Sequence, residues 1–234
     1  MKGMLYGVGV GPGDPELLTL KAVRLIRENN VIAVPGEDAR QTVAYKIAVQ
    51  AVPELENKKL VPVYMPMTHD KEEMEKNHRK GALVLESFLE KGENVIFLTL
   101  GDPTIYSTFT YLQKLVEKDG FQTGLVSGIT SFCAAAARMN IPLTEWSEQL
   151  HIYPATHGFE EKPEREGTYV LMKAGKKLDQ IRKSFEDTKY KVRMIENCGM
   201  ENERIYEDLD EIPDNAGYYS LIIARKSEKR NRNN

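Results

Sequence analysis

The sequence has few cysteines: among its 234 residues only Cys133 and Cys198 occur. Two isolated cysteines are too few for a disulfide framework or a four-cysteine zinc site, so both are expected to be reduced. Long hydrophobic runs are also missing, since none approaches the roughly 20 residues that span a bilayer. The N-terminal residues lack the basic and then apolar order of a signal peptide. These absences lead us to expect a cytoplasmic protein with no membrane partner.

Positive charge is not in excess either, because the formal net charge is −3. A nucleic-acid partner is therefore not expected, since such proteins carry basic patches or stripes. The four histidines show no metal-binding spacing, so no protein-bound metal is expected. With 41% hydrophobic and 29% charged residues the composition is that of a soluble globular protein, and the length suits two domains of about 100 to 130 residues.

The hydrophobic pattern predicts an α/β protein. In the first half, apolar segments of strand length alternate with amphipathic helical segments, as in a sheet covered on both faces. The second half carries more strand signals and two helices. We place the boundary at Asp119-Gly120, which gives domains 1–118 and 119–234, each a mixed sheet flanked by helices. The ligand is expected in a cleft between them. The predicted strands of the first half are 4–10, 31–34, 60–65 and 95–100.

A glycine-rich segment, GVGVGPGDP at residues 7–15, joins the first predicted strand to the first helix. It is not a dinucleotide-binding fingerprint, because Pro12 and Asp14 occupy the final glycine positions of the two possible frames. Four glycines in seven residues indicate a close approach to the backbone or positive φ angles. Two interpretations stay open: a tight turn in which Asp14 caps the helix and Pro15 begins it, or a ligand contact.

Two further motifs follow predicted strands, where α/β sheets bind ligands. In LGDPTIYST, at residues 100–108, Gly101 permits a close approach and Asp102 and Tyr106 offer an acceptor and a donor. Asp102 could fix the loop or transfer a proton, and Tyr106 could orient a ligand or only pack. In VSGITSF, at residues 126–132, Thr130 or Ser131 could cap the next helix or contact a ligand.

The order and spacing of VGVGPGDPELLTLKA, LGDPTIYSTFTYL and SGITSFCAAAARMNIPL resemble the tetrapyrrole methylase family over nearly the whole chain. This resemblance implies a two-domain α/β homodimer that binds S-adenosyl-L-methionine between its domains. Together with ENCGMENERIYEDL near residue 200, the motifs are most similar to the branch that methylates C20 of precorrin-2 or cobalt-factor II in cobalamin biosynthesis.

The resemblance also implies site residues. For the cofactor they are Gly101, Asp102, Pro103, Ile105, Tyr106, Thr130, Ser131, Met172 and Cys198, and for the tetrapyrrole substrate Gly11, Pro12, Gly13 and Asp14. No catalytic base is assigned, with Asp102 and Tyr106 as the nearest candidates.

The substrate of this branch bears several carboxylates, so basic side chains should line the cleft, and Arg40, Lys46 and His157 lie in regions that could do so. Two alternatives remain open. One is a methylase of the same fold with another tetrapyrrole carbon or a non-tetrapyrrole substrate. The other is a non-enzymatic regulator that only binds a tetrapyrrole.

Overall fold

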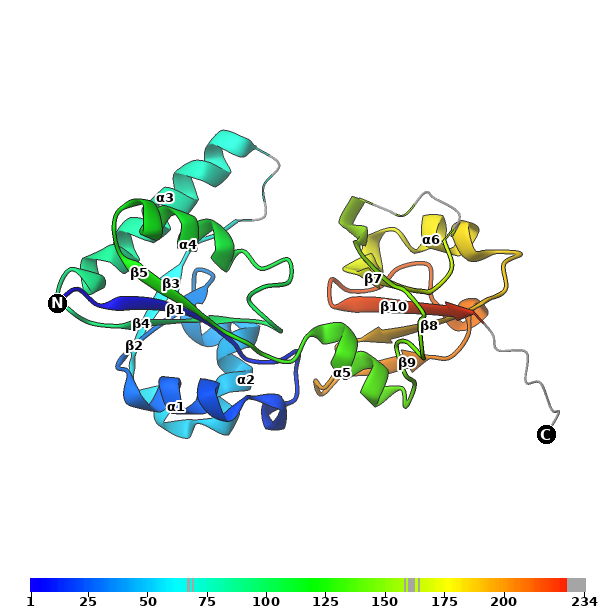
Figure 1. Cartoon of the computed structure of the whole chain (residues 1–234), viewed down its shortest axis with the longest axis horizontal. Coiled ribbons are helices and arrows are strands. Elements are labelled where there is room, and N and C mark those ends of the chain that lie inside the picture. Colours follow the sequence, from blue (N-terminus) through cyan, green and yellow to red (C-terminus); the bar gives the residue numbers. More distant parts are fainter. Residues whose placement is uncertain (67, 69, 158, 160–162, 164, 227–234) are drawn as a thin grey trace. The chain divides into compact units, whose positions relative to one another are not determined.

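The structure is a computed structural model that describes residues 1–66, 68, 70–157, 159, 163 and 165–226 (Figure 1). The chain divides into two compact units, Met1–Thr130 and Ser131–Asn234. Each unit contains its own sheet, and each is described by itself below.

The described part of the first unit contains a five-stranded sheet with the order β3-β2-β4-β1-β5, and all neighbouring strands run parallel (Figure 1). In this order β1 lies between β4 and β5, so the three strands that precede the glycine-containing motifs are neighbours. Their bounds are β1 (Met4–Gly9), β2 (Val31–Pro35), β3 (Lys59–Val63), β4 (Val95–Thr99) and β5 (Gln122–Val126).

Helices cover both faces of this sheet, as the apolar strand β4 predicts, since all five of its residues are buried. Ile32 and Ile96 on one face pack in a cluster with residues of the helices α1 and α2. Val31 and Phe97 on the other face pack with residues of α3 and α4. The helices of the unit are η1 (Pro15–Leu17), α1 (Leu20–Glu28), η2 (Ala39–Gln41), α2 (Val43–Ala51), η3 (Pro53–Asn57), α3 (Lys71–Leu89) and α4 (Phe109–Lys118).

Local sequence signals set the ends of these helices. The side chains of Thr19, Thr42 and Asp70 each accept a hydrogen bond from a backbone N–H in the first turn of α1, α2 and α3 respectively. Such caps satisfy N–H groups that have no partner within the helix. Soon after α3 ends, Gly92 has a φ of 79°, a left-handed conformation that glycine adopts without strain.

The second unit contains a mixed sheet with the order β6-β7-β10-β8-β9, in which β6 and β7 are parallel and the other described pairs antiparallel. Tyr169, Phe185 and Phe159 contribute to an aromatic cluster between the sheet and α6, and α5 also contacts β10. The strands are β6 (Leu150–Pro154), β7 (Thr168–Met172), β8 (Tyr190–Glu196), β9 (Arg204–Tyr206) and β10 (Ser220–Lys226). The helices are α5 (Ser131–Arg138), η4 (Ala155–His157), η5 (Ala174–Lys176), α6 (Leu178–Phe185) and η6 (Leu209–Glu211).

The division between the units differs from the predicted boundary at residues 118 and 119. Strand β5 pairs with β1 in the first sheet, from Met4 opposite Gln122 to Val8 opposite Val126, so the chain up to Thr130 belongs to the first unit. The expected mixed sheet is found in the second unit, whereas the paired strands of the first sheet are all parallel.

Over the same described ranges, no helix is both long and apolar enough to cross a membrane.

Replacement of Phe97 should test the core of the first unit. Its side chain is fully buried, and its ring lies 5.4 Å from that of Phe109 between their centroids. Phe97→Ala leaves a cavity and should lower the free energy of unfolding by about 3–5 kcal/mol in denaturant titrations. Tyr64→Ala, at a side chain about half exposed at the end of β3, is the control and should change it by less than about 1 kcal/mol. Equal losses in both variants would contradict this account of the core.

Candidate functional site

Three loops meet at the carboxyl edge of the first sheet, where β4, β1 and β5 end. The loops after β1 and β4 are joined by backbone hydrogen bonds. The Gly101 N–H donates to the Gly11 carbonyl at 2.8 Å, and the Val10 N–H donates to the Thr99 carbonyl at 3.0 Å. Gly11 and Gly101 have φ angles of 74° and 70°, in the left-handed region that favours glycine. The first two motifs therefore form one joined structure.

Close backbone contact explains two more glycines of the motifs. A Cβ atom built on Gly128 would lie 2.1 Å from the Gly101 carbonyl oxygen, and one built on Gly9 would lie 2.5 Å from the same atom. Real Cβ atoms do not approach oxygen so closely, so a side chain at either position would force the loops apart. The close approach that the glycines predict is therefore made, at Gly9, by a neighbouring loop of the chain itself.

Asp102 ties the second motif to the third. The residue is 7% exposed, and its Oδ1 accepts hydrogen bonds from the Thr104 N–H at 2.8 Å and the Thr104 hydroxyl at 2.5 Å. Oδ2 accepts from the Gly128 N–H at 2.9 Å. Both oxygens are thus engaged with the protein. This arrangement favours the loop-fixing role over proton transfer, because a buried carboxylate held by three donors is poorly placed to accept a proton from a ligand.

The rest of the second motif follows a tight turn. The Ile105 N–H donates to the Asp102 carbonyl at 3.3 Å, and Pro103 is buried. Tyr106 has a φ of 46° and its side chain is about half exposed. A non-glycine residue in this region of φ is strained, and such strain concentrates at functional sites. Ser107 then pairs with Thr99 of β4, at 2.9 Å between their hydroxyl oxygens.

The third loop presents a buried hydroxyl group. The Oγ1 atom of Thr130 has no hydrogen-bond partner among the residues that the structure describes. The interpretation of Thr130 as a side-chain cap of α5 is therefore wrong. An unpaired buried hydroxyl costs about 1–3 kcal/mol, so this atom is a candidate for a ligand contact. Ser131, the other candidate of this motif, is the first residue of α5.

The residues assigned to the substrate lie on the loop after β1. Gly11, Pro12 and Gly13 are buried. The Asp14 side chain accepts a hydrogen bond from the Glu16 N–H at 2.8 Å, and Pro15 is the first residue of η1. The predicted turn, with Asp14 as its cap and Pro15 at the helix start, is confirmed.

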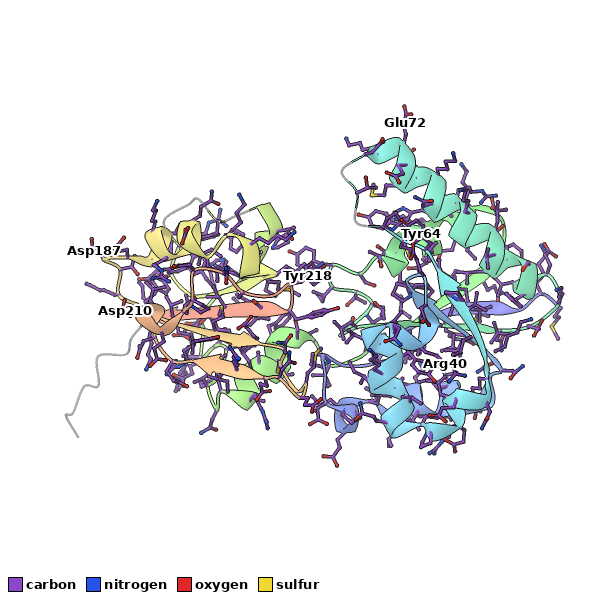
Figure 2. All side chains as sticks on the ribbon, turned by 180° about the vertical axis from the view of Figure 1, so that it is seen from behind. Arg40, Tyr64, Glu72, Asp187, Asp210 and Tyr218 are labelled. Carbon is purple, nitrogen blue, oxygen red and sulfur yellow. The ribbon has the colours of Figure 1, made fainter. Side chains whose placement is uncertain are left out.

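Met172 and Cys198 lie in the second unit, at the ends of strands that flank β10. Met172 pairs with Leu221 of β10, and Glu196 at the end of β8 pairs with Ser220. The loop leading into β10 carries Tyr218, which is labelled in Figure 2. The Lys173 ammonium lies over the Tyr218 ring, 5.4 Å from its centroid. The loops after β7 and β8 therefore share one edge of this sheet with the loop before β10.

Sequence reasoning missed two carboxylates that fix these loops. Glu196 accepts hydrogen bonds from the Gly217 N–H and the Tyr206 hydroxyl, both at 2.9 Å. Burial, together with the bond to Glu196, raises the pKa of the Tyr206 hydroxyl, which is the donor in that bond. Glu203 accepts from the Gly199 N–H at 2.7 Å. The quoted segment ENCGMENERIYEDL contains both residues, but its letters do not indicate their partners.

Two of the three basic residues considered for the substrate, Arg40 and Lys46, are engaged elsewhere. Arg40, labelled in Figure 2, donates to the Glu56 carbonyl at 3.1 Å and to the Tyr45 hydroxyl at 3.4 Å. Lys46 donates to the Gln41 side chain at 3.0 Å. The side chain of His157 lies outside the described residues. Within the described ranges, no group of three or more histidine, cysteine or acidic side chains is arranged to hold a metal ion.

The first unit is a parallel α/β sheet with a loop site at its carboxyl edge, where open α/β proteins bind ligands. Residues 4–213 match the family model of the tetrapyrrole (corrin/porphyrin) methylases. The chain belongs to this family.

Relatives of similar length extend this result. The chain is 35% identical to a protein of Methanocaldococcus jannaschii described as a probable cobalt-precorrin-2 C(20)-methyltransferase, over 96% of this chain and 97% of that one. It is 27% identical to the cobalt-precorrin-2 C(20)-methyltransferase of Salmonella typhimurium, over 97% and 98% of the two chains. The precorrin-2 C(20)-methyltransferase of a Sinorhizobium species is also 27% identical, over 94% of each chain.

Solved structures share the fold at lower identity. A cobalt precorrin-4 methyltransferase aligns with a TM-score of 0.72 and 20% identity, over 95% of this chain and 94% of that one. The uroporphyrin-III C-methyltransferase of Thermus thermophilus, in complex with S-adenosylhomocysteine, aligns with a TM-score of 0.68 and 22% identity, over 95% and 97%.

Asp102→Asn should show how much the link between the second and third motifs contributes. The amide keeps one acceptor but turns an NH₂ group toward an N–H donor, so at least one hydrogen bond is lost. We expect a loss of about 1–3 kcal/mol in the free energy of unfolding, with faster amide hydrogen exchange at Gly128.

Asp38→Asn is the matched control, because the bond that Asp38 accepts among the described residues is an exposed capping bond from the Arg40 N–H at 3.0 Å. Asparagine is an equally good cap, so this variant should behave like the parent protein. Unchanged exchange at Gly128 in the Asp102 variant would rule out the loop-fixing role.

Proposed function

We propose that this protein is an S-adenosyl-L-methionine-dependent methyltransferase that methylates C20 of precorrin-2, or of its cobalt-containing counterpart, in cobalamin biosynthesis. The observation that carries the proposal is the 35% identity, over 96% of the chain, to the Methanocaldococcus jannaschii relative described with this activity. The two bacterial relatives described as C(20)-methyltransferases support it over nearly their full lengths.

The proposed cofactor contacts of the first unit lie in the loop after β4, at residues 100–108, and in the loop after β5. They are Gly101, Asp102, Pro103, Ile105, Tyr106 and Thr130. The buried Thr130 hydroxyl supports this role, because a hydrogen bond from a ligand would remove the cost of leaving it unpaired. Asp102 acts by fixing the shape of the loops, so that the backbone at Gly101 is presented in one conformation. Ser131, Met172 and Cys198 are proposed as the contacts of the second unit.

Methyl transfer to carbon depends mainly on alignment. When bound, S-adenosyl-L-methionine supplies an electrophilic methyl group on a sulfonium, and the acceptor carbon must lie in line with it. The residues of this chain then have three tasks: to bind both molecules, to orient them and to exclude water. Rigid loops suit these tasks, since a displacement of about 1 Å can cost a factor of about a hundred in rate.

The loop of Gly11, Pro12, Gly13 and Asp14 is the proposed contact for the tetrapyrrole. Its hydrogen bonds to the loop after β4 support this assignment, because the residues proposed for the substrate then lie beside those proposed for the cofactor within the first unit. Asp14 is engaged as a cap, so its backbone rather than its carboxylate is the part proposed to face the substrate. A homodimer and a cytoplasmic location stay predictions that the sequence makes.

A labelling experiment tests the reaction. The protein is incubated with S-adenosyl-L-methionine carrying a ¹³C-methyl group and with precorrin-2 or cobalt-factor II in parallel reactions. We expect one labelled methyl group at C20, located by NMR, and S-adenosylhomocysteine released only when an acceptor is present. The acceptor that is turned over more efficiently identifies the metal state of the substrate.

Calorimetric titration with S-adenosylhomocysteine separates binding from turnover. Binding with label at another carbon would favour a different methylase of the same fold. Binding of both ligands without any turnover would favour the non-enzymatic alternative. If no S-adenosylhomocysteine binds, the proposed function is wrong.

A further inference from the structure

The carboxylate of Glu203 joins two separate segments of the second unit. Oε1 accepts a hydrogen bond from Arg138 Nε at 2.7 Å, and Oε2 accepts one from the Gly199 N–H, also at 2.7 Å. Arg138 is the last residue of α5, and Gly199 follows Cys198 in the loop after β8. The Glu203 side chain is only 14% exposed, whereas that of Arg138 is 61% exposed. One side chain thus fastens a loop to a helix.

The loop that Glu203 holds has an irregular backbone. Asn197 and Gly199 both have left-handed φ angles, of 52° and 74°. Within the loop, the Met200 N–H donates to the Asn197 carbonyl at 2.9 Å, and the Glu203 N–H donates to the Met200 carbonyl at 3.1 Å. These bonds close the loop on itself but do not attach it to the helix. The bond between Arg138 and Glu203 attaches the loop to α5.

Both segments carry proposed cofactor contacts. The loop contains Cys198, and α5 begins at Ser131 and ends at Arg138. An α-helix is a stiff element whose ends keep a fixed spacing. A bond from the loop to Arg138 therefore also fixes the loop relative to Ser131. Helix α5 itself contacts β10, so the helix has a firm base within the unit.

We propose that Glu203 is a positioning residue for the cofactor site, with Arg138 as its partner. Glu203 holds the backbone at Cys198 in one place relative to α5, so that both proposed contacts meet the same ligand. The role rests on the proposed function, because it concerns residues assigned to that site. Glu203 need not touch the ligand itself; it acts through the loop that it holds.

The variant Glu203→Gln tests this role with little change in shape. The amide offers one acceptor for two donors, so one bond of the link is lost. We expect the Kd for S-adenosylhomocysteine to rise about tenfold in calorimetry, which corresponds to about 1.4 kcal/mol. In turnover assays the KM for S-adenosyl-L-methionine should rise more than the KM for the tetrapyrrole. A change in stability alone would not produce that split.

The partner provides a second variant that keeps the fold. The Arg138 side chain is 61% exposed, so Arg138→Met should fold and should also weaken S-adenosylhomocysteine binding. In the double variant the two losses of binding free energy for S-adenosylhomocysteine should not add, because both changes break the same link between the loop and the helix. Fully additive losses would contradict the shared role.

The pair of Arg193 and Glu207 provides the matched control. It lies in the same unit and has the same Nε to carboxylate distance of 2.7 Å. Glu207 is not assigned to the site, so Glu207→Gln should leave the Kd for S-adenosylhomocysteine unchanged.

If the parent protein binds S-adenosylhomocysteine but Glu203→Gln binds it equally well, the positioning role is wrong and the proposed function stands. An equal loss in Glu207→Gln would also overturn the role. Failure of the parent protein to bind overturns the proposed function, and this role with it.

Discussion

The first unit depends on one close contact, in which the Gly101 carbonyl lies against the backbones of Gly9 and Gly128. Three loops can approach this closely only where no side chains intervene. The absence of side chains permits this contact. A hydrogen bond stabilises it, because the Asp102 carboxylate accepts from the Gly128 N–H. The parallel order β4-β1-β5 is what brings the three loops to the same edge. The sheet order, the glycines and the buried carboxylate are therefore all needed to hold the three loops together.

Much of the fold could be predicted from local pattern, since β4 is a continuous apolar run of strand length and α3 is a long amphipathic segment. The domain boundary could not be predicted from local pattern. The segment of β5 begins with Gln122 and Thr123 and gives a weak strand signal that does not indicate a partner. That partner, β1, lies far away at the start of the chain. Pairing between strands far apart in the sequence depends on the tertiary structure. Asp119-Gly120 therefore marks the end of a helix but not the end of the first unit.

The site shows the same division between local and distant information. The cap formed by Asp14 and the turn at Pro15 involve neighbouring residues, and both were predictable. The bond from Gly128 to Asp102 and the link from Arg138 to Glu203 join residues far apart in the sequence, so no motif indicates them. Thr130 shows that the preference of a residue type for helix caps does not decide its role. Threonine before a helix favours a cap, yet here its hydroxyl is left unpaired.

The two units fix their loops by different means. In the first, small residues let backbones touch and one buried aspartate locks them. In the second, Glu196 and Glu203 each bind a glycine N–H with one oxygen and a side chain from another element with the other. Both arrangements hold the loop backbone in one conformation, and neither requires a titratable side chain to contact the ligand. That suits methyl transfer, which is governed by the alignment of donor and acceptor. The most conspicuous carboxylate of the site, Asp102, fits this pattern, since it accepts three hydrogen bonds from the chain itself.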